Sequence, residues 1–442
     1  MKDTNNNLKR ELSLSAATAI VVGNMIGSGI FTAPQSLAQA ANPLTTIIAW
    51  VITGIGSLLL ALSFANLGSR YPETGGPIVY TQKAFGEFTG FLIAWTFWIG
   101  SWIGNSAIIT AIMRYLTYFF PVLSTNNTLS FIVASAFLWI VTLINLAGVK
   151  KAGIIGQVTT MLKLAVILVF AAIAIYGFNP EYLTTYSSNE VTGFGTLPNA
   201  IAITLWSFVG LESASISAGE IKNPEKNIKK STILGTVLAS VIYIVLSVLS
   251  MGGLPQDALA ASDAPLADII NNITNASWGG SFISLGIIIS AAGAASGWIL
   301  TTARAAYAAG EDGLFPKFFA TVHPKYKTPV TALIISSLCT NLLMILNYVS
   351  NLTDAFNFMI NLATLSFIPA YAFSACAEII LTHKEGKKLS LIQFLKHSFF
   401  SLLAFFYTLY IIYGSGAESA MWVFILMLLG IPFYVYKKLQ DK

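Results

Sequence analysis

Two long apolar stretches of this chain are interrupted by small and polar residues at about the depth of a membrane midplane. The first contains Gly23-Asn24-Met25-Ile26-Gly27-Ser28-Gly29, and the sixth contains Trp206-Ser207-Phe208-Val209-Gly210-Leu211-Glu212-Ser213. A helix that breaks inside a bilayer frees backbone N–H and C=O groups that lipid cannot satisfy. Such a break persists only where a cavity or a ligand meets those groups. Paired breaks in corresponding positions are typical of a transporter's substrate site.

The composition indicates an all-α integral membrane protein. Of the 442 residues, 55% are apolar and only 10% are charged, and the mean hydropathy is +0.72. A membrane span needs about 20 apolar residues. Windows of that kind predict twelve spans, at residues 12–40, 44–69, 86–118, 129–148, 153–177, 196–218, 230–252, 279–308, 329–348, 354–382, 395–413 and 419–437.

The basic residues indicate how the chain crosses the membrane. All but Arg114 and Lys163 of the 24 Lys and Arg residues fall in alternate connections or near the chain ends. Positive residues accumulate in cytoplasmic loops, so both termini, including residues 1–11, are predicted to be cytoplasmic. We therefore expect a multi-pass protein of the plasma or bacterial inner membrane. The net charge of +5 is then a topology signal and implies no nucleic-acid partner.

A single membrane domain accounts for the whole chain, because no connection is long enough for a soluble domain. If residues 12–177 and 196–382 are two repeats of five spans, their odd number makes the second repeat run opposite to the first. Such an inverted repeat places the two broken helices antiparallel and facing each other. Residues 395–437 then add two further helices.

The first break has the features of a carboxylate site. The N–H groups of Ser28, Gly29 and Ile30 would lack intrahelical acceptors at the positive end of a half-helix. Free carbonyls at the opposite dipole ends, near Met25 and Trp206, suit an ammonium group. An α-amino acid carries both charges on one carbon, so the paired breaks favour an amino acid ligand over glycine kinks used only for packing.

Two ionisable residues lie deep in predicted spans, where a charge is costly. Lys163 is either a structural cation tied to backbone carbonyls or a titrating group. Glu212 follows the second break, where its carboxylate could cap the restarting half-helix, act as a gate, or do both. His323, His383 and His397 lie in or at the edge of cytoplasmic connections, so the span interiors contain no histidine, and Cys339 and Cys376 suit core thiols. Neither a cofactor nor a metal site is predicted, and an enzyme fits poorly because a nucleophile–base pair is missing.

Three further side chains lie near the expected midplane. Most membrane tryptophans belong to interfacial belts, but Trp206 and Trp298 fall well inside their spans. Each is a candidate for a lid over a substrate or for a cation–π partner. Asn105 lies centrally in the third span, where it either joins helices or contacts a substrate side chain.

These motifs resemble the amino acid–polyamine–organocation superfamily, whose members have the LeuT-like fold. The resemblance rests on VGNMIGSGIF at residues 22–31, WIGN at 102–105, TLWSFVGLESAS at 204–215 and DGLFP at 312–316, and it extends from about residue 9 to about residue 435. It is greatest to the basic amino acid and polyamine antiporters of the arginine/agmatine type. The resemblance implies a five-plus-five inverted repeat, twelve transmembrane helices and amino acid exchange by alternating access.

The resemblance also implies which residues hold the two charges that every α-amino acid shares. Ser28 and Gly29 would bind the substrate carboxylate. The backbone carbonyls of Met25, Trp206 and Val209 would receive the substrate amine. These assignments agree with the dipole argument for the two breaks, but they come from the matching positions.

Further roles follow from the same resemblance. Trp206 would act as the occluding lid, and Trp298 would stack on the substrate side chain. Asn105 and the backbone around Ser101 would contact the far end of that side chain. Glu212 would sit at a gate.

Three residues depart from the arginine/agmatine pattern. Phe97 replaces a tyrosine that is thought to help sense pH, and Leu362 replaces a serine that contacts the guanidinium. Lys163 instead resembles the fifth-span lysine of L-amino acid transporters and proton-coupled permeases, whose ammonium occupies the place of a structural sodium. These departures leave arginine specificity and acid activation open.

The sequence therefore predicts a sodium-independent amino acid transporter that works as an antiporter. It would exchange a cationic amino acid or amine, or a neutral amino acid, for a counter-substrate across the lipid bilayer. The alternative is a proton-coupled symporter that uses Lys163. The sequence decides neither the identity of the substrate nor whether the protein is a monomer or a homodimer.

Overall fold

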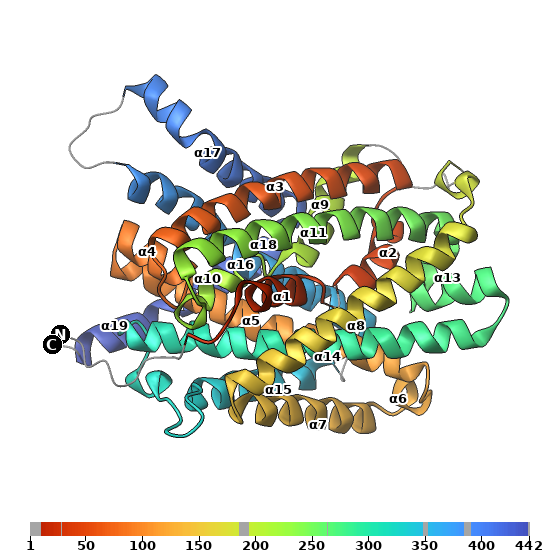
Figure 1. Ribbon diagram of the computed structural model, residues 1–442, viewed down its shortest axis with the longest axis horizontal. Helices are drawn as coiled ribbons and strands as arrows, with labels where there is room; N and C mark the ends of the chain where they lie inside the picture. The colour runs from red at the N-terminus through yellow and green to blue at the C-terminus, as the bar shows by residue number, and fades with distance from the viewer. Residues whose placement is uncertain are drawn as a thin grey trace.

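The computed structural model describes residues 10–27, 29–184, 194–262, 264–347, 352–383 and 390–440, and this part is almost entirely helical (Figure 1). The α-helices are α1 (Leu14–Met25), α2 (Gly29–Ala40), α3 (Pro43–Arg70), α4 (Pro77–Phe85), α5 (Glu87–Thr117), α6 (Val122–Thr125), α7 (Asn127–Leu146), α8 (Val149–Tyr176), α9 (Leu197–Leu205), α10 (Ser213–Ile216), α11 (Pro224–Gly253), α12 (Gln256–Ala261), α13 (Pro265–Thr274), α14 (Ser277–Glu311), α15 (Val330–Asn347), α16 (Leu352–Thr382), α17 (Leu391–Gly414), α18 (Ala417–Leu429) and α19 (Ile431–Gln440). Short 3₁₀ helices are η2 (Pro180–Leu183), η3 (Phe194–Thr196), η4 (Trp206–Phe208), η5 (Ala218–Glu220) and η6 (Lys317–Ala320).

Ten helical stretches in the described part are long and apolar enough to cross a membrane, with α1 and α2 counted together as one. Two of the predicted spans are not among them. The sixth is divided into α9, η4 and α10, and the ninth, α15, has a shorter apolar run. The helical membrane class is thus confirmed, while the arrangement of twelve spans as an inverted repeat stays a prediction.

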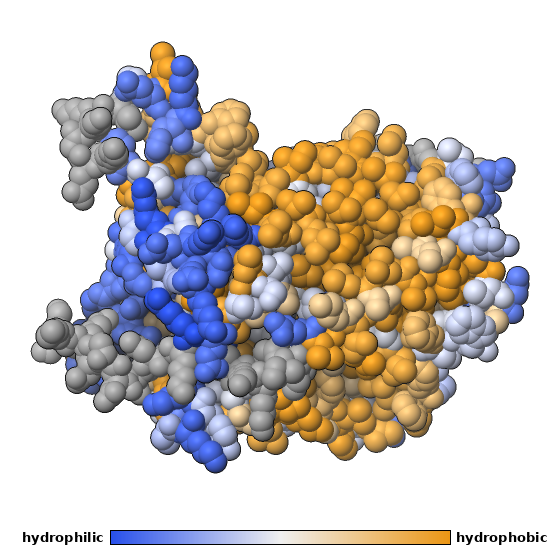
Figure 2. Space-filling view, in the orientation of Figure 1, coloured by the Kyte–Doolittle hydropathy of each residue, from blue (hydrophilic) through white to orange (hydrophobic). Residues whose placement is uncertain are grey.

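The surface divides into an apolar belt and a hydrophilic end. Figure 2 shows hydrophobic residues over most of the flank formed by α3, α8 and α11, whereas hydrophilic residues gather at the end where α4, α10 and α19 lie. Exposed Val241 and Val245 on α11 belong to the apolar flank. Lys83 on α4, and Lys437 and Lys438 on α19, belong to the hydrophilic end. We call this the basic end, and the positive-inside rule predicts that it faces the cytoplasm.

The centre of the molecule is built around α5, which is buried along most of its length and packs against α14 and α16. A Cβ on Gly100 of α5 would come within 2.7 Å of the Ser366 Cβ on α16. Small residues permit such close approach between membrane helices. The half-helix α1 packs against α8, α11 and α14, so the first break lies inside the bundle.

Candidate functional site

The first break lies between α1 and α2. Ser13 caps the start of α1, because its hydroxyl accepts from the Ala16 N–H at 3.2 Å. At the other end the Gly27 N–H donates to the Met25 carbonyl at 2.8 Å instead of continuing the helical ladder. The chain resumes helical geometry at Gly29. Ser28, predicted to hold a substrate carboxylate, lies outside the described residues.

Lys163 meets the carbonyls that this break frees. Its side chain reaches from α8, is completely buried, and donates from Nζ to the Gly23 carbonyl at 2.9 Å and to the Ile26 carbonyl at 2.5 Å. In the part of the chain that the structure describes, Lys163 has no carboxylate partner. The ammonium therefore supplies positive charge to the negative dipole end of α1, which is the geometry expected for a structural cation.

The second break follows α9. The chain passes through η4, becomes extended at Val209 (φ −62°, ψ 128°) and turns at Gly210, whose φ of +114° favours glycine. Helical geometry resumes at Ser213. A Cβ on Gly210 would lie 3.1 Å from the Asn24 Cβ, so the two breaks are in direct contact although they lie far apart in the sequence.

Glu212 secures the second break, though not as a helix cap. It occupies the N-cap position of α10, but its carboxylate accepts no hydrogen bond from the first turn of that helix. Its Oε2 instead accepts from the Gly210 N–H at 3.2 Å and from the Tyr371 hydroxyl on α16 at 2.8 Å. The capping alternative is therefore wrong, because Oε2 accepts from the nearer loop amide and the tyrosine, while Oε1 has no partner among the described residues. Glu212 is completely buried, and it joins the break to α16.

A small cavity, of about 10 Å³, lies where the two breaks meet α5 and α14. Its lining consists of Asn24, Met25, Gly27, Gly29, Ile108, Trp206, Val209 and Trp298. The backbone and aromatic positions expected at a substrate site, namely Met25, Gly29, Trp206, Val209 and Trp298, are thus brought together. None of these lining residues carries a carboxylate.

Sequence reasoning missed three lining residues. Gly27 and Asn24 belong to the first broken segment, and a polar asparagine beside a glycine break was a usable signal. Ile108 lies one helical turn after Asn105 on α5, so it shares a face with the predicted contact residue. An apolar residue in an apolar span gives no signal of its own.

Four other predicted residues lie outside the lining of this cavity. Ile30 is buried in α2, and the Ser101 hydroxyl donates to the carbonyl of Phe97 at 2.7 Å. The Phe97 ring packs edge-on against Phe367 of α16, with centroids 4.9 Å apart. Asn105 joins α5 to α14, because its Nδ2 donates to the Thr302 hydroxyl at 3.0 Å, while its Oδ1 has no partner among the described residues.

Asn24 forms the junction between the breaks and α14. Its Nδ2 donates to the Ser213 hydroxyl at 2.9 Å and to the Thr301 hydroxyl at 3.2 Å. Its backbone carbonyl accepts from the indole N–H of Trp298 at 3.0 Å. One residue of the first break thus contacts the start of α10 and two positions on α14, and movement of any one element disturbs the others.

A second, larger cavity of about 280 Å³ opens beside the central one. It lies between α2, α9 and α16 and includes polar Thr32, Asn199 and Asn361. Gly29 and Trp206 line both cavities. Because a Cβ on Gly29 would lie only 2.6 Å from Cδ1 of Trp206, the indole rests on the start of α2. Trp206 is therefore a wall between the central cavity and this outer cavity.

Comparison with known proteins gives a consistent result. The sequence profile of the amino acid permease family matches residues 12–434. The chain is 34% identical over 438 residues to the arginine/ornithine antiporter of Latilactobacillus sakei, covering 96% of this chain and 90% of that protein. It is 33% identical over 386 residues to the arginine/ornithine antiporter of Pseudomonas aeruginosa, covering 85% and 80%.

A relative named for a different substrate pair is similarly close. The arginine/agmatine antiporter of Chlamydia abortus is 31% identical over 440 residues, covering 96% of this chain and 90% of that protein. The match thus extends over both broken helices and the cavity between them. This chain belongs to the amino acid permease family of the amino acid–polyamine–organocation superfamily.

Proposed function

We propose that this protein is a sodium-independent amino acid antiporter that works by alternating access, with twelve spans and a LeuT-like inverted repeat. The observation that carries the proposal is the meeting of two broken helices at one cavity. Gly210 of the second break touches Asn24 of the first. Freed backbone groups of opposite polarity can then face the same ligand.

The backbone of the two breaks would recognise the part common to all α-amino acids. The N–H groups of Gly29 and Ile30 lie where α2 begins, and together with that of Ser28 they would hold the carboxylate at a positive dipole end. The carbonyls of Met25 and Val209, together with that of Trp206, would receive the amine. In support, Met25, Gly29, Trp206 and Val209 all line the central cavity.

The proposed substrates are amino acids with a cationic side chain, and arginine and ornithine are the ones to test first. The relatives named as arginine/ornithine and arginine/agmatine antiporters support this choice. In the cavity, Trp206 and Trp298 offer aromatic faces, which attract cations without a buried counter-charge. One turn from Ile108, Asn105 has an Oδ1 without a partner among the described residues, and it would accept a hydrogen bond from the far end of a long side chain.

Lys163 is the basis for proposing sodium independence. It supplies a fixed positive charge to the carbonyls of Gly23 and Ile26, the groups for which a bound sodium would otherwise be needed. Trp206 would be the lid between the outer and central cavities. Glu212, tied to α16 through Tyr371, would act in gating together with Phe97, which packs against Phe367 of the same helix.

The experiment that tests this function is exchange by purified protein in liposomes. Vesicles are loaded with arginine or ornithine, or left empty, and uptake of labelled arginine, ornithine, lysine, alanine and serine is measured in sodium and in choline buffer. The proposal expects rapid uptake only with an internal counter-substrate and equal rates in the two buffers. Uptake of none of the five, or a requirement for sodium, would contradict it.

Proton-coupled symport is the second candidate, and one observation favours it. Lys163 is buried against carbonyls and lacks a carboxylate partner in the described residues. No negative side chain there stabilises its protonated form, so it could release a proton during transport. In the liposome experiment, symport predicts uptake into empty vesicles when an inward proton gradient is imposed. Exchange predicts that the gradient alone drives no accumulation.

A further inference from the structure

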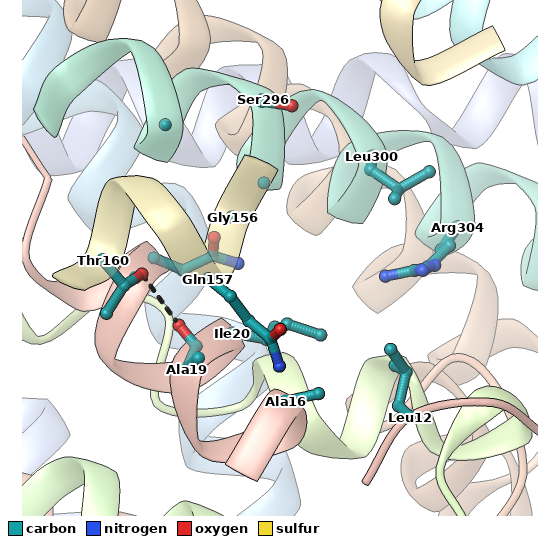
Figure 3. A pocket seen from close by; sticks show the side chains of 14 residues that line it. Leu12, Ala16, Ala19, Ile20, Gly156, Gln157, Thr160, Ser296, Leu300 and Arg304 are labelled. Atoms are coloured by element: carbon teal, nitrogen blue, oxygen red, sulfur yellow. Dashed lines mark hydrogen bonds between the residues drawn. The ribbon is translucent and has the colours of Figure 1, made fainter. Parts of the chain in front are cut away.

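A third cavity, of about 50 Å³, runs along α1 toward Leu12 and Arg304 (Figure 3). It lies between α1, α8 and α14. Gly23 and Asn24 line one end, and Leu12 and Arg304 line the other. Asn24 also lines the central cavity, so the two spaces share a wall at the first break. We call this third cavity the basic-side cavity.

Arg304 gives the basic-side cavity a charged donor. The side chain is 2% exposed, donates to the Ser217 hydroxyl at 2.9 Å and forms an ion pair with equally buried Glu220. Its Nε–H has no partner among the described residues. A buried donor left unsatisfied costs free energy, and Figure 3 shows the guanidinium extending from α14 toward the cavity. The site therefore favours an acceptor, and a planar carboxylate matches a guanidinium best.

Glu220 also holds the cavity's end closed. The Leu12 N–H donates to the Glu220 carbonyl at 2.9 Å, and the Lys222 N–H donates to the Leu12 carbonyl at 2.8 Å. These bonds form a short parallel bridge between the residue pair Leu12 and Ile221. The segment before α1 is thus joined to the segment after the second break. The carboxylate of Glu220 attaches the same point to Arg304 on α14, so one residue links three parts of the closure.

We propose that the basic-side cavity is a second binding station for the transported amino acid, in which Arg304 takes the substrate carboxylate in place of Glu220. The inference rests on the proposed function. An amino acid carboxylate that pairs with Arg304 removes its restraint on Glu220 and loosens the bridge to Leu12. Arrival of the substrate would thereby promote opening of the basic end. The cavity's lining is mostly apolar, and Gln157, Thr160 and Ser296 add polar groups that could meet the rest of the amino acid.

The first test distinguishes binding of the substrate carboxylate by Arg304 from the structural ion pair that Arg304 forms with Glu220. Exchange of labelled L-arginine against L-ornithine is measured in liposomes of defined orientation, with the half-saturation concentration determined on each side. The double variant Arg304→Gln/Glu220→Gln removes the guanidinium without leaving a buried lone charge. It should raise half-saturation at the basic end by about tenfold, the value of one charge-assisted contact, and leave the opposite side unchanged. Glu220→Gln alone keeps the guanidinium and should not raise it. Equal effects of both variants, or equal effects on both sides, would overturn the proposal.

The second test needs no knowledge of the substrate. Thr160→Cys and Met161→Cys are compared in a Cys339→Ser/Cys376→Ser background, using a charged, membrane-impermeant thiol reagent added at the basic end. Thr160 lines the cavity, whereas neighbouring Met161 is 72% exposed on the outer flank of the helix. The proposal expects modification of Thr160→Cys to be about tenfold faster, because a lipid-facing thiol rarely ionises, and to block exchange.

Equal modification rates at the two positions, or undiminished exchange after complete modification of Thr160→Cys, would contradict the second station. If the proposed function is wrong, the same experiment gives a different result. In that case the unmodified protein exchanges no amino acid, while the relative reactivity of the two cysteines still reports whether the cavity opens to water.

Discussion

The two breaks differ in the charged side chain that satisfies their freed backbone groups. At the first break, the carbonyls of Gly23 and Ile26 are met by the ammonium of Lys163, which comes from another helix. At the second break, the Gly210 N–H is met by the carboxylate of Glu212, which comes from the same loop. Each interrupted helix thus has a buried charge matched to part of its freed backbone.

The comparison shows which backbone groups remain available for a ligand. Lys163 approaches the carbonyls at the end of α1, so the N–H groups at the start of α2 are left to the cavity. At the second break, the Ser207 carbonyl accepts from the Tyr243 hydroxyl at 2.6 Å and the Phe208 carbonyl accepts from the Leu211 N–H at 3.3 Å. Among the described groups of this loop, the carbonyl of Val209 therefore remains for the cavity. The groups left over at the two breaks have opposite polarity: N–H groups at the first and a carbonyl at the second. An amino acid carries one anion and one cation, so it can bind both kinds of group at once.

The largest effect is expected from a substitution at the start of α2, where the free N–H groups of the first break lie. Gly29→Ala should weaken amino acid binding by about 100-fold or more, since its Cβ would meet Trp206 at 2.6 Å and the resulting strain is worth ~3 kcal/mol. Gly27→Ala is the matched control, because its nearest atoms lie at 3.6 Å. Equilibrium binding of labelled arginine to purified protein checks both variants. Similar affinities in the two would remove the argument for close backbone contact.

The next effect removes the ion from the first break. Lys163→Met leaves two buried carbonyls without a donor, at ~1–3 kcal/mol each, so we expect exchange to fall at least about tenfold and the melting temperature to drop. Lys163→Arg retains the charge and should retain more of both. Exchange assays and thermal unfolding in the same detergent provide the measurements. A fully active, fully stable Lys163→Met protein would make the lysine dispensable.

Trp206 tests whether the wall between cavities moves. Trp206→Leu should slow exchange about tenfold while changing equilibrium binding by less than about threefold, because a lid acts on the occluded state. Trp298→Leu is the comparison, since Trp298 lines the central cavity but not the outer one and its loss should weaken binding and exchange together. Identical behaviour of the two variants would show that Trp206 is an ordinary wall.

The smallest effect concerns the ion of the second break. Glu212→Gln keeps an oxygen for the Gly210 N–H and the Tyr371 hydroxyl, so exchange should change by less than about threefold if hydrogen bonding is what matters. Glu212→Ala loses both bonds, worth ~1 kcal/mol each, and should lower the melting temperature clearly. If Glu212→Gln lowers exchange and stability as much as Glu212→Ala does, the negative charge itself is required, and Glu212 does more than hydrogen-bond the second break to α16.

Most of the helical architecture could be predicted from composition and the spacing of apolar windows. The residues of the breaks were also predictable, because glycines and polar residues clustered inside an apolar span indicate an interrupted helix. The sixth span was the hardest to delimit. Its middle combines a 3₁₀ turn, extended Val209 and left-handed Gly210, and hydropathy alone does not specify such geometry.

The site was predictable where backbone atoms form it and less so where side chains pack. Met25, Gly29 and Val209 follow directly from the breaks. The position of Asn105 behind the cavity depends on how α5 rotates against α14, and Thr302 could not be identified as its partner from one sequence. The partner of Glu212 was equally hidden, since Tyr371 lies 159 residues away.

The shared position of Trp206 has a consequence for inhibition. The outer cavity, at about 280 Å³, is larger than the central one, at about 10 Å³. A molecule with an amino acid head and an oversized tail could seat its head at Gly29 while the tail fills the outer space and wedges the indole in place. Such a compound would be recognised but not carried. Blockers of this protein can thus be sought among bulky substrate derivatives.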